Sequence, residues 1–332
     1  MRVDLTAPPW ATHLLSDLGD WQRAPLPVAD LRPFEIPDDA YLEYAWLDGQ
    51  GQRREDPANP NPRLNPWWPY ACHVAGPAWR LDPDAAAAAV TAPRGRTLKL
   101  VVASRVLGQE RRALVYTPAG CADRELPLVL FQDGKAYYGW GHAPGVLDRL
   151  VARGDAAPAH LVFVPPQDRT PEYFFNPAYR AFLRDELLPA VAARVAIGRP
   201  RVAWGASLGG LLGAQLAWES GGWFDTVVAQ SGAFLFSPDM TRGDPFHGRE
   251  AFLDLVVAGP QQPLRWWLAC GTLEWLLPSN RRLAEALARG GADARLVTRP
   301  AGHNWVNWRC GLAGALAFAL GPASPRAADA GA

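Results

Sequence analysis

The sequence predicts an α/β protein in which a mostly parallel central sheet is preceded by a small β-sandwich. From about residue 97 onward, apolar runs alternate with helical segments, as strands and helices do in this class. Several of the apolar runs lack polar alternation, which is typical of strands buried on both faces. Earlier in the chain, short apolar stretches alternate with turn residues instead. We therefore expect a sandwich with its linker at 1–78, an α/β domain at 79–322 and a flexible tail at 323–332.

The N-terminal region is predicted to consist mainly of β-structure. The stretch YLEYAWLDG at 41–49 alternates apolar and polar residues and ends in Asp-Gly, which indicates a hairpin. Four prolines between Pro57 and Pro66 exclude regular structure in the linker, which has to pack if its tryptophans are to be covered. The low-complexity run DAAAAAV at 84–90 predicts a short helical or loop spacer.

Eight strands and five helices are predicted in the α/β region. The strands are 97–102, 113–117, 126–131, 160–165, 201–205, 226–231, 265–271 and 294–300. The helices are 144–153, 177–195, 208–219, 279–289 and 309–320. Ser279 and Asn280 are candidate caps of the fourth helix, because both residue types favour that position.

Composition and charge restrict the partners and the compartment. Thirty-three basic and 33 acidic side chains give no net charge, so neither a nucleic acid nor an anionic membrane is expected as the main partner. The start of the chain has no signal-peptide pattern, and no apolar run is long enough to span a membrane. We therefore expect a cytoplasmic location. Four scattered cysteines suit buried thiols better than disulfides or a zinc site, and 15 tryptophans predict aromatic-lined pockets.

Residues 205–209 read Gly-Ala-Ser-Leu-Gly, a G-x-S-x-G pattern between a predicted strand and a predicted helix. In the sharp strand-to-helix turn of an α/β-hydrolase, small residues two before and two after the nucleophile avoid a collision. The pattern therefore predicts the α/β-hydrolase fold with Ser207 as the nucleophile. The alternative is a glycine-rich turn with an inactive serine.

The predicted base is His303. A serine hydroxyl needs a base to remove its proton, and in this fold the chain order is serine, acid, histidine. Of the six histidines, only His303 follows the last predicted strand, in a loop before the final helix. His247 is the second candidate.

The predicted acid is Glu274, which would hold the imidazole in the required tautomer. It comes directly after the strand 265–271, where this fold supplies its acid. A surface carboxylate beside Arg281 or Arg282 is the alternative reading of this residue. Acids from one strand earlier would be Asp239, Asp244 or Asp254.

An oxyanion hole requires two backbone N–H groups directed at the developing charge. The residue after the nucleophile, Leu208, is expected to supply one of them. The second is expected from Lys135, in the loop after the strand 126–131, where Gly134 allows a tight turn. An ordinary Asp-Gly turn is the alternative.

Several segments in one order resemble the enterochelin (ferric enterobactin) esterases within the esterase D-like α/β-hydrolases. YLEYAWLDG with DPANP is similar to the end of that family's N-terminal sandwich and its linker, and LVLFQDG to its strand and turn. The segments WGASLGG, AQSGAF, GTLEWLLPSNRRL and AGHNWVNWRCGL resemble the parts of the family around its serine, acid and histidine. The resemblance implies catalytic roles for Ser207, Glu274 and His303. HLLSDLGDWQRAP also looks like early-set sandwiches of glycogen-binding type.

The chain departs from this family in places. Its N-terminal region is short, whereas the family uses that domain to help form the substrate cleft. Residue 206 is Ala and residue 304 is Asn where some relatives carry larger or acidic groups.

A ferric catecholate siderophore is a bulky trianion, and binding it calls for arginines and aromatic faces. The candidates from family-matched segments and neighbouring loops are Arg169, Arg309, Trp140, Trp275 and Trp305. The alternative role of the tryptophans is packing. For each arginine, the alternative is an ion pair with a structural carboxylate such as Glu172.

The expected function is that of a serine esterase acting on a small-molecule ester, with a siderophore trilactone as the first candidate and no metal or organic cofactor required. A general carboxylesterase or a feruloyl-type esterase is the alternative. A prolyl-oligopeptidase-like peptidase shares G-x-S-x-G-G, but the chain lacks a propeller-length N-terminal domain. A carbohydrate-binding protein with an inactive hydrolase domain is the alternative from another class.

Overall fold

The computed structural model describes residues 1–21, 24–61, 64–66, 68–90, 93–239 and 249–321. Its largest element is an eight-stranded sheet with the strand order β15-β14-β13-β12-β10-β11-β9-β8. The pairs from β15 through β11 are parallel, and β9 and β8 are added antiparallel at one end. The strands are β8 (Arg96–Ser104), β9 (Gln109–Thr117), β10 (Leu126–Gln132), β11 (His160–Val164), β12 (Ile197–Ala206), β13 (Thr226–Gln230), β14 (Arg265–Gly271) and β15 (Ala294–Arg299). This confirms the mostly parallel sheet and all eight predicted strands.

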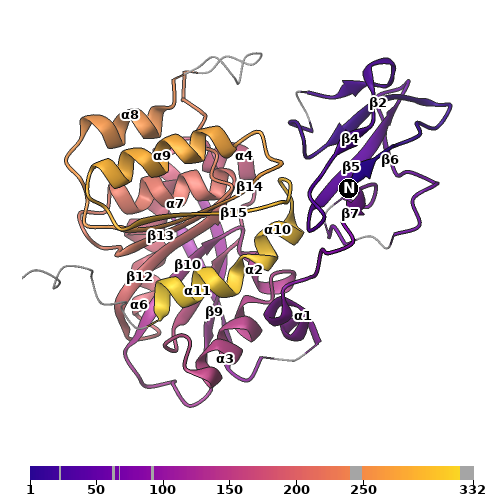
Figure 1. The fold of residues 1–332 in the computed structure, drawn as a ribbon. Coiled ribbons are helices and arrows are strands. Elements are labelled where there is room, and N and C mark those ends of the chain that lie inside the picture. Colours follow the sequence, from indigo (N-terminus) through magenta and orange to yellow (C-terminus); the bar gives the residue numbers. More distant parts are fainter. Residues whose placement is uncertain (22–23, 62–63, 67, 91–92, 240–248, 322–332) are drawn as a thin grey trace, which may run out of the picture.

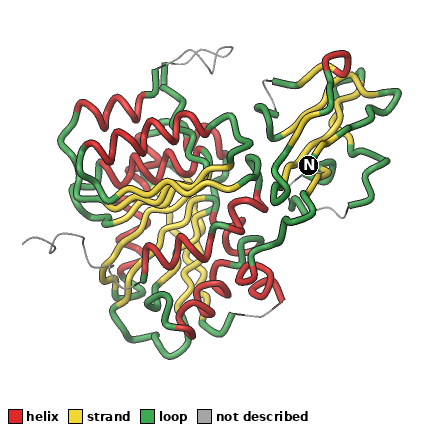
Figure 2. The backbone as a smooth tube through the Cα atoms, in the orientation of Figure 1, coloured by secondary structure: helices red, strands yellow, loops and turns green. Residues whose placement is uncertain are grey.

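Helices cover both faces of the sheet (Figure 2). One face carries α5 (Pro177–Ala181), a π-helical turn (Phe182–Leu187), α6 (Leu188–Ala192), α7 (Leu208–Trp218), α8 (Ala251–Ala258) and α9 (Leu277–Arg289). The other carries α2 (Gly134–Gly139), α3 (Ala143–Arg153), α10 (Trp305–Cys310) and α11 (Leu312–Leu320). The sequence of β10 is apolar throughout because the strand is buried on both faces. Leu128 and Leu130 lie in the core on one face, and Val129 and Phe131 lie in the core on the other.

Several helix boundaries differ from the prediction. Helix α9 begins two residues earlier than expected, and Ser279 and Asn280 are not its caps, because both lie inside the helix and donate side-chain hydrogen bonds to the Leu276 carbonyl. The predicted final helix is two helices, α10 and α11, separated at Gly311. Helices α2, α8 and the short α4 (Arg169–Tyr173) were not predicted, since none shows a long amphipathic repeat.

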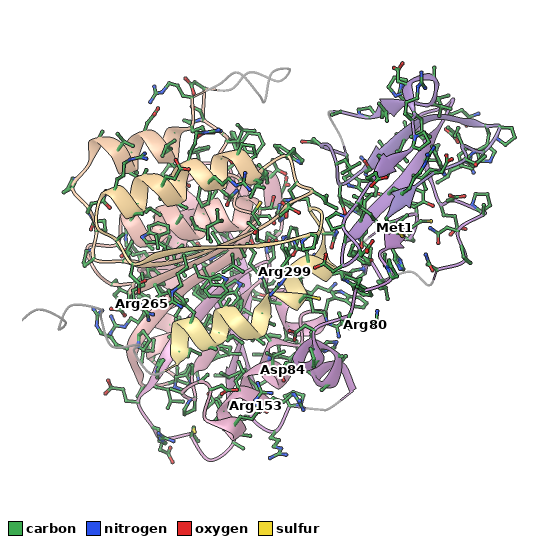
Figure 3. The ribbon with its side chains drawn as sticks, in the orientation of Figure 1. Met1, Arg80, Asp84, Arg153, Arg265 and Arg299 are labelled. Atoms are coloured by element: carbon green, nitrogen blue, oxygen red, sulfur yellow. The ribbon has the colours of Figure 1, made fainter. Side chains whose placement is uncertain are left out.

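The spacer run forms a helix, α1 (Pro83–Val90), which packs on α3. Asp84 of α1 and Arg153 of α3 point toward one another in Figure 3 and form an ion pair with a 2.6 Å N–O distance. No helix in the described part of the chain is long and apolar enough to cross a membrane.

The N-terminal region contains two antiparallel sheets beside α10 (Figure 1). The smaller sheet pairs β1 (Arg2–Val3) with β4 (Phe34–Glu35). The larger sheet contains β2 (Ala11–Ser16), β3 (Leu26–Pro27), β5 (Tyr41–Asp48), β6 (Arg53–Arg54) and β7 (Cys72–Ala75), with a 3-10 turn at Val28–Asp30. Strands β5 and β6 form the predicted hairpin. The domain boundary after residue 78 stays a prediction.

The described linker residues between β6 and β7 contain no strand or helix, yet they are tied to β5. The Tyr44 hydroxyl donates to Asp56 over 2.7 Å, and the Asn65 amide donates to Glu43 over 2.6 Å. The described part of the segment is therefore packed against β5. All four cysteines are buried free thiols. The predicted tail at 323–332 lies outside the described residues.

Candidate active site

Ser207 lies in a sharp turn between β12 and α7. Its φ of 56° and ψ of −123° fall in a region that residues with a side chain rarely adopt. A Cβ atom at Gly205 would lie 2.2 Å from the Gly209 carbonyl, so only glycine fits there. The Ser207 N–H donates to the Gln230 carbonyl on the neighbouring strand over 2.8 Å. The G-x-S-x-G pattern thus holds the hydroxyl at the carboxyl end of the sheet.

The structure brings the three predicted catalytic side chains together. His303 Nε2 is 3.1 Å from Ser207 Oγ, and His303 Nδ1 is 2.8 Å from Glu274 Oε2. With the Nδ1 proton donated to the carboxylate, Nε2 is free to accept the serine proton. The arrangement can therefore generate an oxygen nucleophile.

Glu274 is held from several sides, which explains how a carboxylate can be buried here. Its Oε1 atom accepts hydrogen bonds from Ser231 Oγ at 2.6 Å, the Gly271 N–H at 2.7 Å and Asn307 Nδ2 at 3.1 Å. Ser231 in turn accepts from Trp308 Nε1 at 2.8 Å. These donors satisfy the carboxylate and fix the oxygen that faces the imidazole.

Two tryptophans border the imidazole. The Trp308 ring lies edge-on to it with centroids 5.0 Å apart, and the Trp275 ring is tilted at 6.3 Å. Both contacts restrict rotation of the His303 side chain, and the ring keeps a small exposed area toward the cavity.

The two predicted oxyanion donors border the same cavity as Ser207. Leu208 is the first residue of α7, and Lys135 lies in the first turn of α2. Neither backbone N–H donates to another residue in the described part of the chain. A Cβ atom at Gly134 would lie 2.2 Å from the Val164 nitrogen, so the turn that presents Lys135 requires glycine.

The cavity above Ser207 has a volume of about 550 Å³ and aromatic walls. The hydrolase region contributes Phe236, Trp275, Trp305 and Trp308 to these walls. The N-terminal region contributes Asp20, Trp21 and Trp68, which the sequence had not indicated. The rings of Trp21 and Trp68 are 4.8 Å apart and tilted, so they pack on each other at the wall.

Arg169 lines this cavity, but much of its hydrogen-bonding capacity is used within the protein. It forms a bidentate ion pair with Asp133, at 2.7 and 2.8 Å, and donates to the Ala206 carbonyl at 3.1 Å. Glu172, the partner considered from the sequence, is instead held by the buried Arg111 at 2.6 and 2.9 Å. Arg169 thus fixes the turn before α2 while facing the site.

The structure does not bring Arg309 and Trp140 to the cavity. Arg309 points toward α1, where its guanidinium donates to the Ala85 carbonyl over 2.7 Å. Partial burial lowers the pKa of this guanidinium. Trp140 directly follows α2, is 47% exposed and does not border the cavity.

The alternative catalytic residues have other surroundings or cannot be placed. Asp254 pairs with Arg249 at 2.9 Å on the surface, and Asp239 accepts a hydrogen bond from Ser237. His247 and Asp244 lie outside the described residues.

Ser231 and Asn307, which both donate to Glu274, were also not singled out from the sequence. Ser231 belongs to the family-like segment AQSGAF, so the resemblance offered a signal for it. Asn307 follows Asn304 by three residues, the spacing at which a helix cap and its partner meet, but nothing in the sequence pointed to Glu274 as its second contact.

Fold and site together define an α/β-hydrolase with a serine, a histidine and a carboxylate in hydrogen-bond contact. Residues 104–319 match the sequence pattern of a family described as putative esterase. The chain belongs to this esterase family and is a carboxylic-ester hydrolase.

Solved esterase structures share the fold. The enterochelin esterase of Shigella flexneri has 20% identity and a TM-score of 0.72, with 93% of this chain and 90% of that chain covered. The ferric enterobactin esterase of Salmonella typhimurium has 21% identity and a TM-score of 0.71, with 86% and 80% covered. A ferulic acid esterase has 22% identity and a TM-score of 0.58, with 69% and 99% covered. No curated protein matches the chain. The predicted resemblance to enterochelin esterases is thus confirmed for the fold.

Proposed function

We propose that the protein hydrolyses esters through an acyl-enzyme on Ser207, with His303 as general base and Glu274 as the acid that orients it. The observation that carries this proposal is the continuous hydrogen-bond chain from Ser207 Oγ to Glu274 Oε2, with distances of 3.1 and 2.8 Å. Such a chain activates an alcohol at neutral pH without requiring the carboxylate to take the proton.

In the proposed reaction, Ser207 Oγ attacks the ester carbonyl while its proton moves to His303 Nε2. The oxyanion is stabilised by the N–H groups of Leu208 and Lys135. The imidazolium then gives its proton to the leaving alcohol oxygen, and the acyl group stays on Ser207. Water attacks the acyl-enzyme with His303 again as base, which releases the acid and restores the serine.

We propose a bulky, aromatic and anionic ester as the substrate, with a siderophore trilactone as the first candidate. The support is the size of the cavity, about 550 Å³, its tryptophan walls, and the cationic side chain of Lys135 at its border; the second cation there, Arg169, is already paired with Asp133. The Shigella flexneri enterobactin esterase, solved in the presence of enterobactin, matches 93% of this chain at a TM-score of 0.72.

A feruloyl-type ester is the second candidate, because an aromatic acid would also suit these walls. The ferulic acid esterase covers only 69% of this chain. The additional wall formed by Trp21 and Trp68 is what favours the larger substrate.

A substrate panel tests both the proposed ester hydrolysis and the proposed substrate class. It compares iron-loaded and iron-free catecholate trilactones, feruloyl esters and 4-nitrophenyl esters, with Ser207→Ala as the inactive control. We expect kcat/KM to be highest for the trilactones, and a higher value for feruloyl esters would replace this substrate assignment. Absence of fluorophosphonate labelling together with retention on amylose would favour the carbohydrate-binding alternative.

A further inference from the structure

The carboxylate of Asp17, directly after β2, is fully buried and joins three parts of the molecule. Its Oδ1 atom accepts a hydrogen bond from Trp21 Nε1 at 2.9 Å, and Trp21 forms part of the cavity wall. Its Oδ2 atom accepts from the Glu43 N–H of β5 at 2.8 Å and from Asn304 Nδ2 at 2.7 Å. The last of these contacts crosses from the N-terminal region to the residue next to His303.

Asn304 continues the contact toward the catalytic groups. While its amide nitrogen donates to Asp17, its Oδ1 atom caps α10 by accepting from the Asn307 N–H at 2.9 Å. The Asn307 side chain donates to Glu274 Oε1 and to the Gly302 carbonyl, both at 3.1 Å. Both residues flanking His303 are therefore fixed by one hydrogen-bonded network, which ends on the catalytic carboxylate.

The N-terminal region also holds the backbone of this loop. The Tyr41 N–H donates to the Pro300 carbonyl at 2.9 Å, and the Gly302 N–H donates to the Tyr41 carbonyl at 3.2 Å. A Cβ atom at Gly302 would lie 2.1 Å from the Cβ atom of Asp17. The loop before His303 thus runs in contact with β5 and with Asp17, and it has no room to shift toward them.

We propose that Asp17 is a positioning residue for His303: it acts through Asn304 to keep the imidazole within reach of Ser207. The inference rests on the proposed function. Asp17 touches neither substrate nor nucleophile, so its effect is on the alignment of the base, where a displacement of about 1 Å can cost on the order of a hundredfold in rate. Through Trp21, the same carboxylate connects the cavity wall to this loop.

The test is a double-mutant cycle on the full chain with 4-nitrophenyl acetate, a small ester that does not need the aromatic wall. Asp17→Asn keeps the shape of the side chain but places an amide opposite donors. Asn304→Ser keeps a good helix cap, since serine favours this position, but is too short to reach Asp17. We expect each variant to lower kcat about tenfold or more with KM within about twofold, and the rate of fluorophosphonate labelling to fall in parallel. The double variant should lose no more than the worse single variant, because both changes break one contact.

Asp56→Asn is the matched control. Asp56 is also a buried carboxylate of the N-terminal region and accepts from Tyr44 and the Ala58 N–H, and no hydrogen bond joins it to the loop of His303. Its kcat should stay within about twofold of wild type even where its melting temperature falls. If Asp17→Asn fails to fold, Asn304→Ser alone decides, since it removes the same contact from the hydrolase side.

Two results would overturn the inference. One is a folded Asp17→Asn or Asn304→Ser variant with wild-type kcat; the other is additive losses in the double variant. An active Ser207→Ala variant would instead show that the proposed function itself is wrong, so the two failures are distinguishable.

Discussion

Ser207 combines reactivity with an uncommon backbone conformation. A φ of 56° with a ψ of −123° is costly for a residue with a Cβ atom, and the turn persists because Gly205 and Gly209 leave it space. The sequence predicted this conformation through the spacing of its glycines, because the steric demand of the turn is local.

Replacement of Ser207 by alanine should lower kcat by roughly 10⁶, since the members of a catalytic triad act as a unit. Steady-state kinetics with a 4-nitrophenyl ester measure the loss, and circular dichroism checks that the fold is kept. A variant that retains more than about 1% of the wild-type activity would contradict the assignment of the nucleophile.

Replacement of Glu274 by glutamine should leave more activity than the serine variant, with a loss in kcat of up to about 10⁴. The amide oxygen would stay with the three donors to Oε1, so the amide nitrogen would face His303 Nδ1 and could not accept its proton. The imidazole would then be held in the wrong tautomer. Kinetics across pH 6–9 measure this loss. Wild-type activity would move the acid elsewhere, with Asp254 the next candidate.

The site beyond these three residues depends on contacts that sequence spacing does not encode. Asn304 and Asp17 meet across 287 residues of chain. Nothing in the local sequence of either residue indicates the other. Arg309 illustrates the reverse case, because a family-like segment placed it near the site whereas its side chain turns to α1.

Among the elements, strands were predicted better than helices. The central strands β10, β11 and β13 are apolar runs buried on both faces, which is a strong signal, whereas β8, β9 and β15 toward the ends of the sheet are partly exposed. Helices α2 and α4 are only six and five residues long, too short to show an amphipathic repeat. They form because the turns after β10 and β11 are fixed by long-range contacts such as the Asp133–Arg169 pair.

The α4 segment depends on one buried ion pair. Arg111 on β9 is almost fully buried, and the Glu172 that it holds also accepts from the Gln167 and Asp168 N–H groups. Arg111→Met should therefore destabilise the protein by about 3–5 kcal/mol, because it leaves a buried carboxylate without its counterion. Urea unfolding measures this change. The exposed Arg112→Met, whose partner Glu110 is also exposed, is the control and should cost less than about 1 kcal/mol. Equal effects would show that the Arg111–Glu172 pair does not secure α4.

For the molecule as a whole, the junction between the N-terminal region and the hydrolase region carries a buried acidic pair. Burial, with a further contribution from the nearby Asp17 carboxylate, raises the pKa of Glu43 to about 8. Burial also raises the pKa of Asp17, to about 6. Tyr41 and Asn65 are the other side chains that hydrogen-bond to Glu43. At neutral pH the folded protein thus keeps a proton that the unfolded chain has lost.

This proton makes stability pH-dependent with a defined sign. Between the ordinary glutamate pKa and about 8, the folded state binds more protons than the unfolded state, so the free energy of unfolding falls as pH rises. Glu43→Gln should raise that free energy at pH 8.5 by on the order of 2 kcal/mol and have little effect near pH 4.5. Thermal melts of both proteins across this range test the prediction, and parallel curves would contradict it.

The short contact of Tyr41 with residues 300–302 has a further consequence. Strand β15 is the last strand of the eight-stranded sheet, and Tyr41 pairs in parallel with Ala301 just beyond its end. An unprotected outermost strand offers its free amide and carbonyl groups to any other polypeptide. Removal of the N-terminal sheets would leave the Pro300 carbonyl and the Gly302 N–H without their partners on Tyr41, so polar backbone groups at the end of β15 would be open to solvent or to another polypeptide.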